Sequence, residues 1–313
     1  MPPRTRIIVN PKAAAGQAGR DLDALKAAVA RLLPHAELVQ TRAAGHGRHL
    51  AREAARTGIE VLGAVGGDGT IHEVVDGLFE GSTPISPNLV LGVIPAGTGS
   101  DLRRSLELPE ERSAALRVLA NGRTREIDVV HTTIQTDTGR HEEHFVNVAG
   151  FGANGEVVRH ANQMDKRLGG RLTFFRASLK TSVQYRPAEV ALRWRDASNR
   201  EHTWQGRTAS VFVANGHYCG GGMLVGGGGR MDDGLVDVTV LPPDSAATQI
   251  VQARRLYDGS LGDWPGARRF QARELEARPV SSAPIQLDLD GENPGRIPVI
   301  FRVLPRALRI RTA

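Results

Sequence analysis

Two glycine-rich segments, each with one aspartate, carry the residues best suited to chemistry in this sequence. Gly66-Gly67-Asp68-Gly69-Thr70 follows an apolar run and precedes a helical pattern, and Pro95-Ala96-Gly97-Thr98-Gly99-Ser100-Asp101 repeats that arrangement. Glycines let a backbone approach phosphate oxygens, and N–H groups at a helix start favour anions. An acid in such a loop suits a cation, because Mg²⁺ binds carboxylate and phosphate oxygens together. The pattern predicts a nucleotide-phosphate site with Mg²⁺; a plain tight turn is the alternative for either loop alone.

A third segment of the same kind, Asn10-Pro11-Lys12-Ala13-Ala14-Ala15-Gly16, leaves the first apolar run. Lys12 can direct a positive charge at phosphate. We expect Thr70 to cap the helix that follows it and to offer a hydroxyl to phosphate. Neighbouring parallel strands would bring the three loops to one sheet edge, where open α/β sheets bind ligands. The Walker A pattern GxxxxGK[ST] does not occur, which excludes a P-loop protein.

The elements around these loops alternate between short apolar runs and amphipathic segments. Fully apolar strands that alternate with helices indicate a parallel sheet covered on both faces. The expected strands are 6–10, 36–41, 59–65 and 89–97, and the expected helices are 22–33, 48–57, 71–79 and 110–120.

From about residue 124 the pattern changes to short alternating or β-branched runs separated by Gly, Asn, Asp or Pro. Such runs are typical of an antiparallel β domain. Two helical insertions, near 160–184 and 244–258, are expected to interrupt it.

Composition sets limits on the class of protein. The 313 residues carry a formal net charge of +6, a single cysteine, Cys219, and 4% aromatic residues. A basic chain favours anionic lipid surfaces or anionic small molecules. The few aromatics and the absence of long basic runs argue against a nucleic-acid platform. No signal-peptide pattern or bilayer-length apolar run occurs, so the expected location is the cytoplasm.

The ordered motifs resemble those of one known family. GGDGTIHE followed by LGVIPAGTGSDLRR resembles the diacylglycerol kinase catalytic domain of bacterial soluble lipid kinases, relatives of sphingosine kinase. The Asn-Pro opening, FVNVAGFGANGEVV, ANGHYCGGGM, MDDGLVDV and LDLDGE match the rest of the pattern in order. GGDGT alone is shared with NAD kinases, whereas the ordered set is specific and spans essentially the whole chain.

The resemblance implies an α/β nucleotide-binding domain with a parallel sheet, as in NAD kinase and diacylglycerol kinase, and a C-terminal antiparallel β-sandwich. The first would span 1–128 and be joined by the chain end from about 300 to 313; the second, 129–299, would take the lipid. The implied activity in lipid metabolism is ATP- and Mg²⁺-dependent transfer of the γ-phosphate to a lipid hydroxyl. Diacylglycerol, giving phosphatidic acid, is the first candidate.

Several alternatives stay open. The acceptor could be another lipid alcohol, such as a sphingoid base or phosphatidylglycerol. An NAD kinase or a phosphofructokinase-like sugar kinase shares GGDGT, although the PAGTGSD loop and the terminal DGE argue against both. The third alternative is a nucleotide-binding regulator without catalysis. The resemblance further implies peripheral contact with anionic membrane, and homodimers are common in the family.

The family's functional residues carry over position by position. Glu292 would be the proton acceptor, with Asp290 beside it, and Asp68 and Asp101 would organise Mg²⁺. A second, structural Mg²⁺ would be bound by Asp233 and the backbone carbonyls of Arg230 and Leu235. The implied ATP contacts are Asn10, Pro11, Lys12, Ala13, Ala14, Thr41, Gly66, Gly67, Asp68, Gly69, Thr70, Ile71, His72 and Thr98.

Two of these motifs also have a simple structural interpretation. Asp290-Gly291 is a favourable hairpin turn, and Asp233-Gly234 is a turn between strands. The sequence departs from the family at His72 and Ser100, where asparagine is common. It also departs at Gly226–Gly229, where the family often has proline and alanine. Four glycines predict a looser loop leading into the structural metal site.

Overall fold

The computed structural model describes residues 2–14, 16–96, 100–136, 139–163 and 185–313. The chain divides into two compact units, one formed by Met1–Val129 with Arg306–Ala313 and the other by Val130–Pro305. The expected site residue Thr98 and most of the helical insertion expected near 160–184 lie outside the described residues.

The first unit is built on a parallel sheet whose strands follow the order β2-β1-β3-β6-β19. Every residue of β1, β3 and β6 is buried, as the continuous apolar runs predict. The chain end therefore adds the last strand of this unit's sheet. The strands are β1 (Thr5–Val9), β2 (Glu37–Gln40), β3 (Val61–Gly66), β6 (Val90–Pro95) and the end of β19 (Val299–Thr312).

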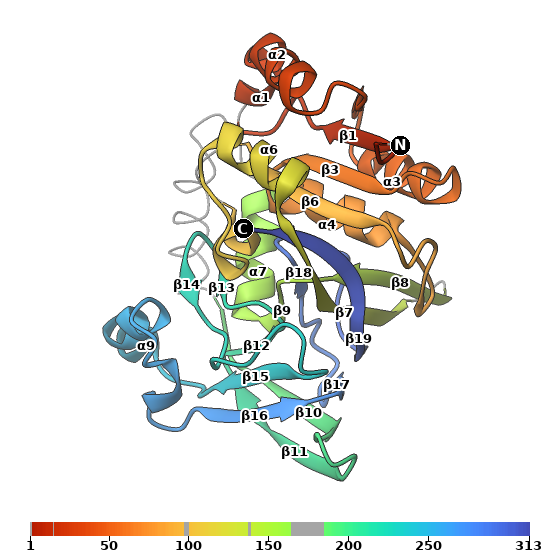
Figure 1. The fold of residues 1–313 in the computed structure, drawn as a ribbon. Coiled ribbons are helices and arrows are strands. Elements are labelled where there is room, and N and C mark those ends of the chain that lie inside the picture. The colour runs from red at the N-terminus through yellow and green to blue at the C-terminus, as the bar shows by residue number, and fades with distance from the viewer. Residues whose placement is uncertain (1, 15, 97–99, 137–138, 164–184) are drawn as a thin grey trace. The chain divides into compact units, whose positions relative to one another are not determined.

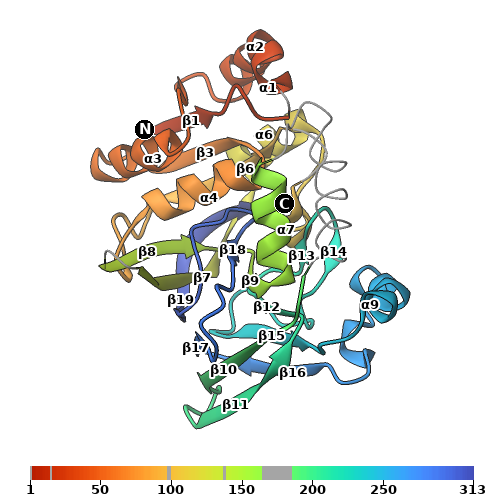
Figure 2. The same cartoon turned by 180° about the vertical axis from the view of Figure 1, so that it is seen from behind.

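Helices cover both faces of this sheet. Leu25 and Val29 of α2 and Leu116 and Leu119 of α6 share a core with β1, β3 and β6. Figure 1 shows α6 in front of the strands, and Figure 2, seen from behind, shows α4 there. The helices of the unit are α1 (Gln17–Arg20), α2 (Leu22–Leu32), α3 (His46–Arg56), α4 (Asp68–Gly77), α5 (Asp101–Ser105) and α6 (Arg112–Asn121), and the small hairpin is β4 (Phe79–Glu80) with β5 (Thr83–Pro84).

The second unit contains two antiparallel sheets. One has the order β16-β15-β12-β9-β18, and the other contains β11-β10-β17-β19 with the β7–β8 hairpin. Their apolar faces share one core, in which Val213 and Val238 of the first sheet join Leu275 and Phe301 of the second. The strands are β7 (Arg123–Thr136), β8 (Gly139–Phe145), β9 (Val148–Gly152), β10 (Ala188–Arg195), β11 (Glu201–Thr208), β12 (Ser210–Ala214), β15 (Val236–Leu241), β16 (Arg268–Ala272), β17 (Glu274–Pro279) and β18 (Leu287–Leu289).

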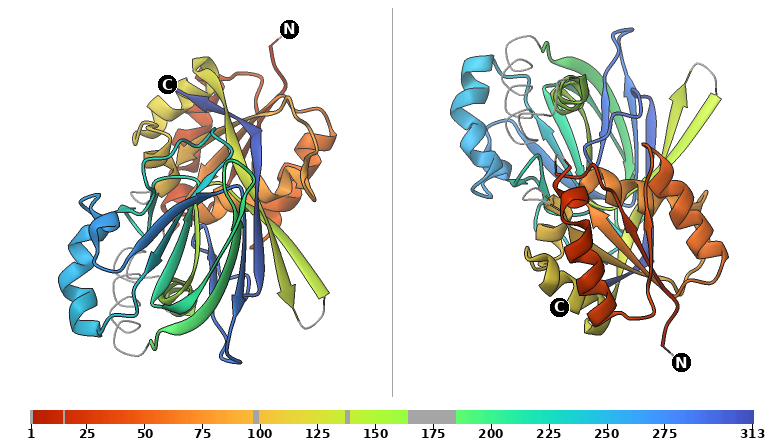
Figure 3. Two further views of the ribbon diagram at one scale, coloured as in Figure 1. Left: turned by 90° about the horizontal axis from the view of Figure 1, so that it is seen from below. Right: turned by 90° about the horizontal axis from the view of Figure 1, so that it is seen from above.

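Smaller elements complete this unit. They are α7 (Ala153–Gln163), the β13 (Tyr218–Cys219) and β14 (Met223–Leu224) pair, α9 (Ala246–Gln252), η2 (Ala253–Leu256) and η3 (Leu261–Asp263). The two views of Figure 3 show α9 at the periphery of the sandwich. The predicted fold class, a parallel α/β domain followed by an antiparallel β-sandwich, is confirmed. Among the described residues, no helix combines the length and apolar character needed to cross a bilayer.

Candidate functional site

The first candidate site lies at the carboxyl edge of the parallel sheet. From β1 the chain moves outward to β2 and then returns to β3 on the opposite side of β1. Such a reversal of strand order opens a crevice between the loops that follow the two central strands. Asn10 follows the first of these strands and Gly67 follows the second, so the glycine-rich loops lie at this point.

A hydrogen bond joins the two loops. The side-chain amide of Asn10 donates to Oγ1 of Thr70 at 2.9 Å, while its oxygen accepts from the Lys12 backbone at 3.0 Å. The sequence led us to expect that Thr70 caps α4, but it does not. The helix begins two residues earlier, at Asp68, with Gly67 in the capping position. The Thr70 hydroxyl therefore positions Asn10 instead of closing the helix start.

The first two glycines of the GGDGT loop meet different surroundings. A Cβ at Gly66 would lie 2.4 Å from the Thr70 side chain, so this position has no room for a larger residue. A Cβ at Gly67 would meet nothing within 4 Å. Close packing therefore explains Gly66, whereas the space beside Gly67 fits the close approach of a ligand.

Other residues expected to contact nucleotide are divided between surface and core. Lys12 and Ala14 are exposed, whereas the Ile71 and His72 side chains are 1% and 3% exposed. The Thr41 backbone donates to the Val9 carbonyl at 2.9 Å, which extends the β1–β2 pairing by one residue. The structure thus brings these residues to one edge, but Ile71 and His72 place their side chains inside the unit.

Asp68 connects its loop to the next one. Its carboxylate accepts from the Ser100 hydroxyl at 3.3 Å and from the backbone N–H groups of Asp101 and Leu102 at 3.2 and 3.4 Å. These groups form the start of α5, where unpaired N–H groups and the helix dipole attract negative charge. The acid of one glycine-rich loop therefore caps the helix that follows the other.

The donor set fits a magnesium ion. Asp101 is buried and its Oδ1 pairs with Arg104 at 2.6 Å, while its backbone binds Asp68. Two carboxylates beside a hydroxyl supply the hard oxygen donors that Mg²⁺ prefers.

Glu73 has a role that the sequence did not indicate. Its two carboxylate oxygens accept from the backbone N–H groups of Gly45 and Gly47 at 2.7 and 2.9 Å, at the start of α3. Two acids of α4 thus bind the starts of other helices: Asp68 binds the start of α5, and Glu73 binds the start of α3. The only sequence signal was the position of Glu73 at the end of the GGDGTIHE motif.

In the second unit, the segment LDLDGE forms a tight hairpin turn. Leu289 and Glu292 exchange backbone hydrogen bonds at 2.9 Å, and Asp290 and Gly291 both have positive φ, at 50° and 89°. Asp290 accepts from the N–H groups of Val146, Asn147 and Val148 at 3.2, 3.1 and 3.0 Å. The predicted hairpin is confirmed, and Glu292 lies exposed just after it.

The turn expected to hold a structural metal is closed by its own acid. Asp233 accepts from the backbone N–H groups of Arg230 and Leu235 at 3.2 and 3.0 Å, and the Arg230 side chain pairs with Asp232 at 2.8 Å. The three expected ligand residues are therefore together. They are joined through the backbone N–H groups of Arg230 and Leu235, which donate to the Asp233 carboxylate, and not through the carbonyls expected as metal ligands.

The glycine run before this turn is held in place, contrary to the looser loop expected. Oδ2 of Asp237 accepts from the backbone N–H groups of Gly227 and Gly229 at 2.7 and 3.0 Å. A Cβ at Gly229 would lie 2.8 Å from that same oxygen. The glycines therefore allow the backbone to wrap closely around a carboxylate from β15. Across the described ranges, no cluster of three or more His, Cys, Asp or Glu side chains is arranged to bind a metal.

Two family models match the chain in succession. The diacylglycerol kinase catalytic domain matches residues 4–132, and the YegS C-terminal NAD kinase beta sandwich-like domain matches residues 147–312. The second model alone matches more than half of the chain. Together they span both glycine-rich loops, the Asp233 turn and the Asp290 turn.

Individual proteins agree with these models. A diacylglycerol kinase of Bacillus subtilis is 29% identical over 98% of this chain and 95% of its own length. A probable lipid kinase YegS-like of Chromohalobacter salexigens is 30% identical over 79% of this chain and 74% of its own length. The crystal structure of a putative diacylglycerol kinase from Bacillus anthracis has the same fold, with a TM-score of 0.77 at 22% identity over 99% of this chain and 95% of that chain. The chain belongs to the bacterial diacylglycerol kinase-like and YegS-like lipid kinases.

Proposed function

We propose that the protein transfers the γ-phosphate of ATP to the hydroxyl of a membrane lipid, with diacylglycerol as the first candidate acceptor. The observation that carries this proposal is the convergence of Asn10, Thr70, Asp68 and Asp101 at the switch point of the parallel sheet. Glycine-flanked N–H groups and oxygen donors at that edge suit a triphosphate and its cation. Membership of a lipid kinase family supports the choice of acceptor.

Asp68 and Asp101 are the residues that would hold Mg²⁺ in this proposal. When bound, the ion supplies neutralisation of the charge that builds up on the phosphate oxygens. The chain's own contribution is to hold the acids in position. Asp68 is held by the start of α5, and Asp101 is held by Arg104. Lys12, exposed after β1, would add positive charge toward the phosphates.

Glu292 is the proposed proton acceptor for the lipid hydroxyl. It is exposed, and it follows a turn whose Asp290 is held by three backbone N–H groups. A general base needs a defined position within reach of its proton, and a rigid turn supplies one. We assign Asp290 the role of positioning Glu292, and Glu292 the role of taking the proton as the oxygen attacks phosphorus.

Access to a membrane lipid requires a surface that can contact the bilayer. We propose that the α9 surface, formed by Ile250, Val251 and Tyr257, provides it. Their side chains are 63%, 70% and 60% exposed, although apolar residues of this size are buried throughout the core. Arg254 lies exposed between them in the sequence and can attract anionic lipid headgroups. The resulting contact would be peripheral and sensitive to salt.

The reaction is tested by incubating the protein with labelled ATP and Mg²⁺ and a panel of diacylglycerol, sphingoid base, phosphatidylglycerol, NAD and sugar phosphates. Labelled product from diacylglycerol supports the proposal in full. Labelled product from another lipid supports a lipid kinase with a different acceptor. Label in NAD alone contradicts a lipid kinase. Tight ATP binding with no labelled product favours a nucleotide-binding regulator.

The membrane contact is tested by sedimentation with vesicles of phosphatidylcholine and phosphatidylglycerol. Replacing Ile250 and Val251 by serine should weaken binding on the order of tenfold, because apolar area no longer leaves water. Val280→Ser is the matched control, since this valine is also exposed, at 44%, but lies outside the α9 surface. Equal binding by the double variant and the control would rule out the α9 surface. A loss of self-association instead would identify a dimer contact.

A further inference from the structure

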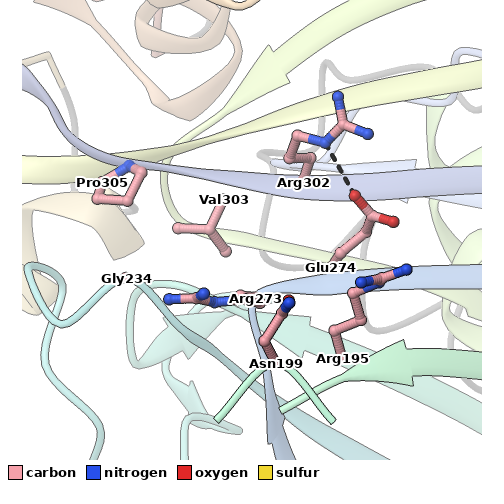
Figure 4. Close-up of a pocket in the computed structure, with 8 residues that line it drawn as sticks. All are labelled: Arg195, Asn199, Gly234, Arg273, Glu274, Arg302, Val303 and Pro305. Atoms are coloured by element: carbon pink, nitrogen blue, oxygen red, sulfur yellow. Dashed lines mark hydrogen bonds and ion pairs between the residues drawn. The ribbon is translucent and has the colours of Figure 1, made fainter. Parts of the chain in front are cut away.

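A pocket of about 580 Å³ lies within the second unit, apart from every residue discussed as nucleotide-binding. Its polar lining consists of Arg195, Arg273, Arg302, Glu274 and Asn199, and it is bounded on one side by Gly234. In Figure 4 the Arg273 side chain extends toward Gly234, while Arg195 and Arg302 lie near Glu274, which a dashed line joins to Arg302. Its volume is in the range of small-molecule sites.

The strand register places the charged groups in this pocket. Arg195 of β10 lies opposite Glu274 of β17, and Glu274 in turn lies opposite Arg302 of β19. Directly paired residues on neighbouring strands project from the same face, so these three side chains form one row. The backbone of Arg273 donates to the Arg195 carbonyl at 2.9 Å and its own carbonyl accepts from Val303 at 3.0 Å, which places a third arginine beside this row, directly before Glu274 in the chain.

The charges in the pocket do not balance. Three arginines and one glutamate line it, and Glu201 lies beside Arg195, so the arginines still outnumber the acids by one when Glu201 is included. Glu274 binds Arg302 through Nε at 2.9 Å. The ion pair between Arg195 and Glu201 is long, at 3.8 Å, and among the described residues we find no hydrogen bond or ion pair for the Arg273 guanidinium. An anion would offset this excess of positive charge.

The rest of the same sheet face shows what a saturated arrangement is like. Glu276 accepts from Nε of Arg193 at 2.9 Å and also binds Arg278. Although burial raises the pKa of Glu276, the hydrogen bonds from these two arginines lower it overall. Glu276 serves two arginines at once, whereas the pocket leaves Arg273 without such an acid.

We propose that this pocket binds a phosphate group, either as inorganic phosphate or as the phosphomonoester headgroup of an acidic phospholipid. The planar guanidinium fork matches two phosphate oxygens, and a surplus of arginines around the pocket favours a doubly charged anion over a carboxylate. Asn199 can add an amide donor from the turn between β10 and β11. The site is independent of the proposed transfer reaction and would sense phosphate or acidic lipid.

The test measures how far phosphate protects individual arginines from modification by phenylglyoxal. The wild-type protein is used, and peptide mass spectrometry reports the extent of modification at each arginine. The rate of Arg273 modification is measured in rising phosphate against chloride at equal ionic strength. Protection should saturate, and at ten times the dissociation constant of phosphate the rate should fall roughly tenfold. Arg278, held by Glu276, is the internal control and should react at the same rate in both salts.

Two vesicle arms separate the possible sources of the phosphate group. Phosphatidylcholine vesicles with phosphatidic acid are compared with phosphatidylcholine alone. Protection by inorganic phosphate supports a free-anion site, and protection by phosphatidic acid vesicles only supports a lipid headgroup site. Unchanged Arg273 modification in every arm would overturn the proposal, as would equal protection of Arg278.

A variant provides a second measurement. With the nucleotide site saturated by a non-hydrolysable ATP analogue, Arg273→Gln should lose the phosphate-binding heat seen in calorimetry, while Arg278→Gln keeps it. Both guanidinium groups are on exposed residues, so neither change removes core packing. Phosphate binding that persists unchanged in Arg273→Gln would contradict the assignment.

Discussion

Each unit contains an Asp-Gly step whose acid holds distant backbone, and the two steps differ in how tightly they do so. Asp68 accepts from one hydroxyl and two N–H groups at 3.2 to 3.4 Å and is half-buried. Asp290 accepts from three N–H groups at 3.0 to 3.2 Å and is 9% exposed. Its backbone also adopts a positive φ of 50°, which aspartate tolerates better than most residues.

The difference separates two uses of the same acid. Long hydrogen bonds at the positive start of a helix leave Asp68 able to exchange a partner for a cation. Bonds of ordinary length from three successive N–H groups, at 3.0 to 3.2 Å, join Asp290 to the segment that begins β9, and Glu292, two residues further on, lies exposed. We therefore infer that Asp290 contributes to the proposed reaction by positioning Glu292, and Asp68 by binding a cation with its negative charge.

The largest expected effect is on turnover and comes from Glu292→Gln. Removing the proton acceptor should lower kcat by about 10²–10⁴ with little change in ATP affinity. Steady-state kinetics and ATP titration measure the two quantities. Glu110→Gln, at another exposed glutamate, is the control and should leave kcat unchanged. Wild-type turnover in Glu292→Gln would remove this residue from the chemistry.

The next effect is on stability and distinguishes the two aspartates. Asp290→Asn should cost about 2–4 kcal/mol of unfolding free energy, because an amide cannot accept from three N–H groups as a carboxylate does. Denaturant unfolding measures the loss. Asp258→Asn should cost far less, since this exposed aspartate accepts from the Ser260 backbone, at 2.9 Å, within its own turn. Equal losses of unfolding free energy in the two variants would contradict the role of Asp290 in holding three backbone N–H groups.

Asp68→Asn should affect the Mg²⁺ requirement of the reaction more than the stability of the fold. Loss of the α5 cap should cost about 1 kcal/mol of stability, less than the Asp290 variant. The Mg²⁺ concentration required for half-maximal turnover should rise, because one ligand loses its charge. Titration of activity with Mg²⁺ checks this. A variant as unstable as Asp290→Asn, with an unaltered Mg²⁺ requirement, would break the comparison.

The smallest effect concerns pH and the second unit alone. Burial lowers the pKa of His131, and the neighbouring His144 lowers it further against the opposing effect of Glu142. Below about pH 6.5 this histidine is therefore protonated in the unfolded chain but stays neutral in the folded chain. The free energy of unfolding should for that reason fall as the pH drops below about 6.5. Thermal unfolding from pH 7.5 to 5 measures the slope. His131→Gln should flatten it, and a steeper slope in this variant would contradict the assignment.

The sequence by itself determined the layout of the molecule. Fully apolar runs such as 61–65 can be buried on both faces only in a covered parallel sheet, and each glycine-rich loop then has to follow a strand at the same edge. The Asp290-Gly291 turn was also readable, because positive φ at both central residues favours this dipeptide. These features depend on residues close together in the chain.

Only the tertiary structure decided which groups the acids bind. Asp68 meets α5 more than 30 residues away, Glu73 meets the start of α3, and Asp290 meets residues more than 140 positions earlier. The arginine pocket likewise depends on the register of three strands that are far apart in sequence. Periodicity and turn chemistry report local conformation, whereas a hydrogen bond between distant segments depends on how sheets and helices pack. For that reason the sequence predicted where the acids lie, and only the packed structure determined what each one holds.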